Sequence, residues 1–171
     1  MMSGNRLARA IPVSILIFII YIVFTGSATL YDIITGVLIS VVIGVIIANI
    51  VISNPYKPFS PRRWIWFLAY ALYYFFIAEV KAHIDVIKRI LDPRMPMNPG
   101  IVKIPINVNS DYAITAVANS ITNTPGTVVV EIDEKNKYFY VHWINVKAID
   151  MEKAYMEISH SFEKFSSKVF D

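Results

Sequence analysis

The side chains most able to do chemistry gather where an uncharged aromatic run meets the first charges. Glu79, Lys81, His83 and Asp85 follow this run at alternate positions. A carboxylate inside a membrane is a suspect for ion transport, because lipid does not solvate it. Glu79 lies at the end of its run, however, where water and headgroups solvate it and Lys81 could neutralise it. We interpret Glu79, and likewise Asp32 at the edge of an earlier apolar run, as interfacial anchors.

Other arrangements that support enzyme chemistry are missing from the sequence. It contains no cysteine, which excludes disulfides, a thiol nucleophile and Cys-ligated metal centres. The histidines, His83, His142 and His160, do not lie at metal-ligand spacing from one another. There is no phosphate-binding glycine loop, dinucleotide fingerprint or nucleophile elbow. We therefore predict no catalytic, cofactor-binding or metal-binding residues, and no enzyme activity for the chain itself.

The composition is typical of a membrane protein with a water-exposed part. The chain is 56% hydrophobic and 17% charged, with a mean hydropathy of +0.51, whereas soluble domains are about 45–50% apolar and about 25% charged. Residues 1–78 contain a single acid, whereas residues 79–171 carry balanced charges. The net charge of +3 is not clustered, which gives no case for nucleic-acid binding. The absence of cysteine and glutamine suits a thermophilic source.

The first part of the chain, residues 1–63, predicts a transmembrane helical hairpin. The uncharged runs 10–31 and 33–56 are each long enough to cross a bilayer, which takes about 20 residues. The connection between them is short and uncharged, so we expect a tight turn and a retained anchor rather than a cleaved signal peptide. Small residues recur every fourth position in the second run, which predicts a helix-packing face. These residues are Gly36, Ser40 and Gly44.

The second part, residues 64–99, predicts one long aromatic helix over 64–91 followed by a proline-rich linker. Arg6 precedes the hairpin and Lys57 follows it, which favours cytoplasmic ends by the positive-inside rule. A third crossing would place a region rich in Lys and Arg outside. We therefore expect the long helix to lie along the cytoplasmic interface or against partner subunits, because its tryptophan and tyrosine side chains favour the membrane surface. The alternative is a third span with the C-terminal part outside.

The third part, residues 100–171, predicts a small α+β domain with the order βαββα. Strands are expected over 101–106, 127–132 and 138–144, a helix after Ser110, and one last amphipathic helix near the end. Phe139, Val141 and Trp143 alternate with polar positions and should face the core. Thr124, Pro125 and Gly126 predict a structural turn, in which proline fixes one dihedral angle and glycine supplies another.

Four stretches together resemble the E-type subunit of the Mrp-type multisubunit Na⁺/H⁺ antiporters. They are Glu79–Lys88, Asn98–Ile101, Asn119–Val128 and Val141–Val146. The most specific is Ser-Ile-Thr-x-Thr-Pro-Gly-Thr, within the third stretch, and the match covers nearly the whole chain. Asn123 departs from the leucine expected at its position. Similar subunits occur in archaeal membrane-bound hydrogenases and their sulfur-metabolising relatives, which contain an Mrp-like module.

The resemblance implies a non-catalytic, multi-pass subunit of the plasma membrane that supports assembly of the Na⁺/H⁺-translocating part. Its partners would be the lipid bilayer and other small and large antiporter-like subunits, and it would need no cofactor. Glu79, Lys81, His83 and Asp85 would then lie at a subunit interface or beside an ion path. A stand-alone membrane-anchored binding module, and a membrane enzyme with its site near Glu79, remain alternatives. The sequence leaves open the parent complex, the cation and the number of spans.

Overall fold

The structure is a computed structural model that describes residues 3–52 and 54–171, with side chains described from Leu7 onward. The side chain of Arg6, used above for orientation, lies outside this described part. The chain divides into two compact units, residues 1–60 and residues 61–171. Each unit is described by itself below. The three-part division at residues 63 and 99 stays a prediction.

The first unit is a helical hairpin of α1 (Ser3–Thr25) and α2 (Leu30–Val51). Gly26 has φ +63, the left-handed conformation that commonly ends a helix. Thr29 then starts α2 through a capping box, in which its hydroxyl accepts from the Asp32 amide and the Asp32 carboxylate accepts from the Thr29 amide. Most other side chains on both helices are exposed and apolar, which is the surface a membrane hairpin needs.

The second unit begins with a continuous helix of 61–91, three residues longer at its start than expected. It comprises α3 (Pro61–Tyr73), the π-helical turn η2 (Tyr74–Ala78) and α4 (Glu79–Leu91). Pro61 suits the first helical position, where its missing N–H would have no partner. The π-helical turn was not expected from sequence. Such turns are rare and often mark functional positions in helices, and this one immediately precedes Glu79.

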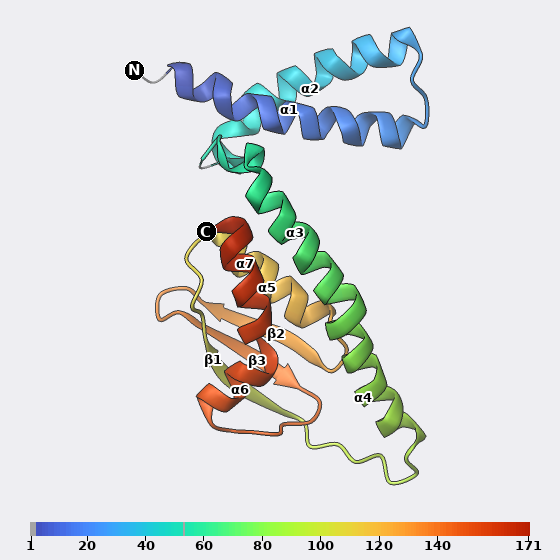
Figure 1. Cartoon of the computed structure of the whole chain (residues 1–171), viewed down its shortest axis with the longest axis vertical. Coiled ribbons are helices and arrows are strands. Elements are labelled where there is room, and N and C mark those ends of the chain that lie inside the picture. The colour runs from blue at the N-terminus through green and yellow to red at the C-terminus, as the bar shows by residue number, and fades with distance from the viewer. Residues whose placement is uncertain (1–2, 53) are drawn as a thin grey trace. The chain divides into compact units, whose positions relative to one another are not determined.

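The second unit contains a three-stranded antiparallel sheet in the order β1-β3-β2 (Figure 1). The strands are β1 (Gly100–Pro105), β2 (Thr127–Asp133) and β3 (Tyr138–Trp143). A register irregularity between Val129 and Glu131 bends the edge strand β2. The α+β architecture expected from the sequence is confirmed, with β3 as the central strand.

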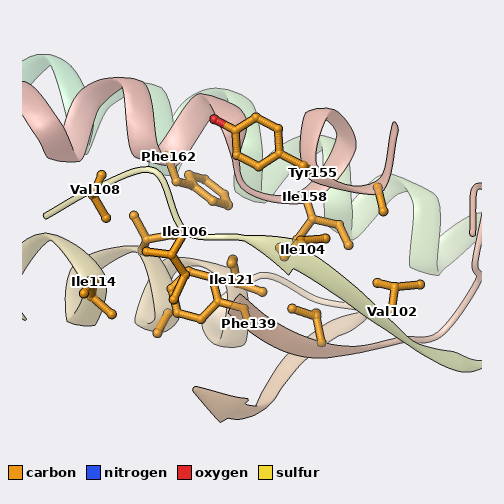
Figure 2. Packing of buried hydrophobic residues seen from close by; sticks show 14 of the residues in the cluster. Val102, Ile104, Ile106, Val108, Ile114, Ile121, Phe139, Tyr155, Ile158 and Phe162 are labelled. Carbon is orange, nitrogen blue, oxygen red and sulfur yellow. The ribbon is translucent and has the colours of Figure 1, made fainter. Parts of the chain in front are cut away.

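Helices α5 (Asp111–Asn123), α6 (Met151–Ile158) and α7 (His160–Phe170) complete this domain. The single last helix expected from sequence is interrupted at Ser159, so the order ends in two helices. The core contains Phe139 and Val141 of β3, both fully buried, packed with isoleucines of β1 and α5 (Figure 2). The inward alternation predicted for β3 therefore holds in the structure.

Candidate functional site

The helix α3 uses its tyrosines to contact the α+β domain. Tyr70 is 7% exposed and stacks on Phe165 of α7, with ring centroids 5.7 Å apart and planes 4° apart. Tyr73 lies 5.0 Å from the same ring. Lys168 of α7 places its ammonium 3.7 Å from the ring centre of Trp66. The expectation that these aromatic side chains face the membrane surface is wrong for this face of the helix, because α7 covers it.

Glu79 lies at the start of α4, with only 17% of its side chain exposed. His83, one turn later, bonds through Nδ1 with the Glu79 carbonyl oxygen at 2.8 Å and lies 3.4 Å from Oε2 of the carboxylate. Tyr74 interacts with the side chains of both Glu79 and Thr124. Glu79 is therefore connected to the domain through Tyr74, while its Oε1 atom is buried with no hydrogen bond of normal geometry from the described residues.

The other two charged residues of this group have different surroundings. Asp85 accepts two hydrogen bonds from Arg89, at 3.0 and 3.1 Å, and Arg89 also donates to the Pro96 carbonyl at 2.8 Å. This fork ties the end of α4 to the linker. Lys81 is exposed and lines an open cleft between α4 and the domain. The structure thus groups Glu79 with His83 and separates both from the Asp85 pair.

The turn between α5 and β2 has the geometry of a type II turn. Gly126 has φ +95, and the Thr127 amide donates to the Thr124 carbonyl at 3.3 Å. A Cβ on Gly126 would lie 3.0 Å from the side chain of Ile144 and 3.7 Å from that of Val86. The turn therefore lies between helix α4 and the residue that follows strand β3, and Tyr74 contacts it as well.

The small residues predicted as a packing face lie against α1 within the hairpin. Gly36, Ser40 and Gly44 are buried. A Cβ on Gly36 would lie 2.7 Å from the ring of Tyr21, and one on Gly44 would overlap the hydroxyl of Ser14. Close approach of the two helices therefore requires glycine at both positions.

Asp32 is held at the tip of the hairpin through one of its carboxylate oxygens. Its Oδ2 atom accepts hydrogen bonds from the hydroxyls of Ser27 and Thr29, both at 2.6 Å, and from the Thr29 amide at 3.2 Å. A carboxylate near a helix N-terminus is also favoured by the helix dipole. The single acid of the hairpin thus acts as a helix cap.

A buried acid in α7, Glu163, was missed by the sequence reasoning. It is 3% exposed, and its two oxygens accept from the Asn107 amide at 3.2 Å and the Tyr155 hydroxyl at 3.0 Å. Burial raises the pKa of Glu163 from its ordinary value, although these hydrogen bonds oppose the shift. Burial, together with the Glu163 charge, raises the pKa of Tyr155 to about 12. The only sequence signal is that Glu163 follows Phe162 in the apolar stripe of α7.

No catalytic or metal constellation emerges from these parts. Within residues 3–52 and 54–171, no three His, Asp or Glu side chains come together in a way that could hold a metal ion. The candidate residues form contacts between elements: a helix cap, a turn contact, an ion pair and a buried hydrogen-bonded acid. In the described part of the chain, three helices are long and apolar enough to cross a membrane, namely residues 7–25, 30–51 and 61–91.

A family model and individual related proteins both identify the same family for this chain. The family model described as a Na⁺/H⁺ ion antiporter subunit matches residues 14–169. The E-type subunit of the Na⁺/H⁺ antiporter of Alkalihalophilus pseudofirmus is 31% identical over 92% of this chain and 96% of its own length. The corresponding Bacillus subtilis protein is 33% identical over 65% of this chain and 71% of its length.

A solved structure extends the likeness to the fold. A chain of the membrane-bound sulfane sulfur reductase, an archaeal respiratory membrane complex, is 33% identical with a TM-score of 0.83. The match covers 95% of this chain and 99% of the other. These relatives and the apolar helices identify a multi-pass protein of the plasma membrane. The chain belongs to the family of E-type Na⁺/H⁺ antiporter subunits.

Proposed function

We propose that this chain is a non-catalytic subunit that supports assembly of the Na⁺/H⁺-translocating part of a multisubunit membrane complex. The proposal rests mainly on Asp32, whose carboxylate accepts hydrogen bonds from Thr29 in the cap of α2. An ion carrier needs an ionisable group that can bind and release its ion within the membrane. The hairpin offers apolar packing surface instead, which suits contact with lipid and with other antiporter-like subunits.

We also propose that only the hairpin crosses the bilayer. The helix of 61–91 carries the α+β domain along one face, from Arg63, which donates to the Val169 carbonyl, to Val86 beside the Gly126 turn. If this helix crossed the bilayer as it is docked here, α7 would enter the membrane with it and carry Lys168 along. A lysine costs about 2.5–3.5 kcal/mol at the bilayer centre and less toward the surface. A position along the cytoplasmic surface avoids this cost, and it places the domain in the cytoplasm.

The parent complex is either an Mrp-type antiporter or a respiratory complex with an Mrp-like module. Similarity supports both, because curated relatives are antiporter subunits and the solved relative belongs to a sulfane sulfur reductase. In either complex the redox or ion-carrying groups would belong to other subunits. The subunits that accompany this chain decide between the two.

The test is co-purification of the full-length tagged chain from its native membrane in mild detergent. Stoichiometric recovery of long antiporter-like subunits is expected, and hydrogenase-like or reductase subunits beside them would identify the respiratory complex. A monomer that binds a soluble ligand would support the stand-alone binding module and contradict the proposal. Catalytic turnover by the isolated chain would contradict the non-catalytic role.

A matched pair of variants shows whether the hairpin is required for assembly. Gly44→Leu places a side chain where Ser14 of α1 lies, so it should open the hairpin and abolish co-purification. Val45→Leu places the same leucine side chain at the next position, which is 41% exposed, and should leave the complex intact. Equal recovery of both variants would show that the closed hairpin is not needed.

A further inference from the structure

A role in assembly leaves unexplained a cleft between α4 and the α+β domain. Its volume is about 640 Å³, within the range of about 300–1,000 Å³ typical of ligand pockets. One wall is the helix from Tyr73 to Lys88, and the other is formed by the turn at Pro125, by Trp143 and by α6. All of these residues belong to the second unit.

Apolar side chains make up part of the lining of this open cleft, and we call them its floor. Ile77, Ile84 and Met156 line it and are 56%, 47% and 51% exposed. Trp143, from the central strand, also lines it. Exposing such side chains to water costs about 25 cal/mol per Å² of apolar surface. The floor is therefore suited to a hydrocarbon chain.

Three lysines line the cleft from two walls, and we call them its rim. Lys81 and Lys88 lie seven residues apart on α4, and Lys147 follows β3 on the opposite side. Two acids also line the cleft, but Asp85 is neutralised by its two hydrogen bonds to Arg89, which leaves Glu157 as the opposing charge. The rim is consequently cationic.

We propose that this cleft binds an anionic phospholipid of the cytoplasmic leaflet. The headgroup phosphate contacts the lysines of the rim, and an acyl or isoprenoid chain lies on the apolar floor. Basic pockets at the cytoplasmic side of membrane proteins bind anionic headgroups in this way, and each lysine near a membrane surface contributes about 1 kcal/mol. The proposal rests on the placement of the 61–91 helix at the membrane surface.

The charge of the rim is tested with the purified full chain in a zwitterionic detergent. Native mass spectrometry would follow binding of dioctanoyl phosphatidylglycerol, with dioctanoyl phosphatidylcholine and inorganic phosphate as separate probes. The anionic lipid should bind at least about tenfold more tightly than the zwitterionic lipid, and inorganic phosphate should not displace it. Equal binding of the two lipids, or full displacement by phosphate, would overturn the proposal.

Variants then locate the site. The triple variant Lys81→Ala, Lys88→Ala, Lys147→Ala should remove the preference for the anionic lipid. A matched control with Lys135→Ala, Lys153→Ala and Lys164→Ala removes the same charge from exposed positions outside the cleft and should keep it. Met156→Trp fills the floor without changing the charge and should weaken binding of both lipids. Equal behaviour of the two triple variants would contradict a site in the cleft.

A photoreactive residue at Ile84 in the intact native complex distinguishes lipid from protein. A phosphorus-containing lipid adduct is expected after illumination. An adduct to another subunit would show that a protein segment fills the cleft and would overturn the lipid assignment. This outcome would leave the proposed assembly role standing, so the two proposals can fail separately.

Discussion

The guanidinium of Arg63 donates a hydrogen bond to the main-chain carbonyl of Val169, 2.6 Å away and 106 residues later in the chain. The last carbonyls of a helix lack partners within the helix, and a cation near them is favoured by the helix dipole. Arg63 therefore fixes the end of α7 to the first turn of α3. This contact joins the start of the aromatic helix to the domain and gives a partner to a carbonyl at the end of α7.

Replacing Arg63 tests the contact directly. Arg63→Ala should lower the free energy of unfolding by about 1.5–3 kcal/mol, the usual contribution of a hydrogen bond to a charged group. Arg62→Ala removes the same charge from the neighbouring exposed position and should change stability by about 0.5 kcal/mol or less. Thermal unfolding of the purified chains, followed by tryptophan fluorescence, makes the comparison. Equal losses in the two variants would argue that Arg63 acts through charge alone.

The turn at Gly126 is predicted to be structural. Gly126→Val forces a β-branched residue to φ +95 and brings its Cβ to 3.0 Å from Ile144, so it should destabilise the domain by about 1–3 kcal/mol. Gly100→Ala is a milder control, because its Cβ would meet only the tip of Val146 at 3.1 Å. Native gels should show loss of assembled complex for Gly126→Val. An assembled complex with altered cation preference would contradict a structural role.

The sequence predicted those parts of the fold whose pattern is local. The hairpin follows from two uncharged runs, and the turn before β2 follows from Pro125 and Gly126. The partner of Tyr70 could not be predicted, because an aromatic stripe suits a membrane surface and a domain contact equally well. The same limit applies to Glu163, whose hydrogen-bond partners Asn107 and Tyr155 come from other elements.

The buried Glu163 predicts that stability falls as the pH rises. Its pKa is raised above the ordinary value of 4.5, mainly by burial. Below pH 4.5 the folded and unfolded chains both carry the proton. As the pH rises from there to the folded-state pKa, the unfolded chain loses the proton first, so stability decreases until the folded state is also ionised.

Glu163→Gln keeps a hydrogen-bond acceptor for Asn107 and removes the ionisable group. The free energy of unfolding of Glu163→Gln, relative to that of the wild type, should therefore increase from pH 4.5 upward and then level off. Melting temperatures measured between pH 4.5 and pH 8 would show this. Glu157→Gln, at an exposed position of α6, is the control and should follow the wild type. Parallel curves for Glu163→Gln and the wild type would refute the prediction.

The proposed topology places the β2–β3 loop and the tip of the hairpin on opposite sides of the membrane. Lys135→Cys is a better probe of the loop than a cysteine at position 136. Asn136 closes the loop with hydrogen bonds to Asp133 at 2.9 and 2.8 Å, which its replacement would remove. In this cysteine-free chain, Lys135→Cys should resist an impermeant thiol reagent in intact cells. Ala28→Cys, exposed at the tip, should react readily. Labelling of Lys135→Cys from outside would favour three spans.

The acids at the edges of the apolar part decide whether this subunit carries ions. Asp32→Asn keeps an oxygen that can accept from Thr29, so we expect a loss of about 0.5–1 kcal/mol in helix capping and unchanged transport. Glu79→Gln should weaken the contact with His83 and the neighbouring Tyr74, and should reduce the amount of assembled complex.

Cation-dependent proton flux in vesicles, normalised to assembled complex on a native gel, separates assembly from transport. Flux per complex should remain close to wild type for both variants, because the proposed role assigns ion transport to other subunits. Asp32 is held by three hydrogen bonds within the hairpin tip, whereas Glu79 has one buried oxygen without a normal hydrogen bond from the described residues. Glu79→Gln is therefore the more demanding test. A fully assembled Glu79→Gln complex without flux would place Glu79 on the ion path and reject the accessory role.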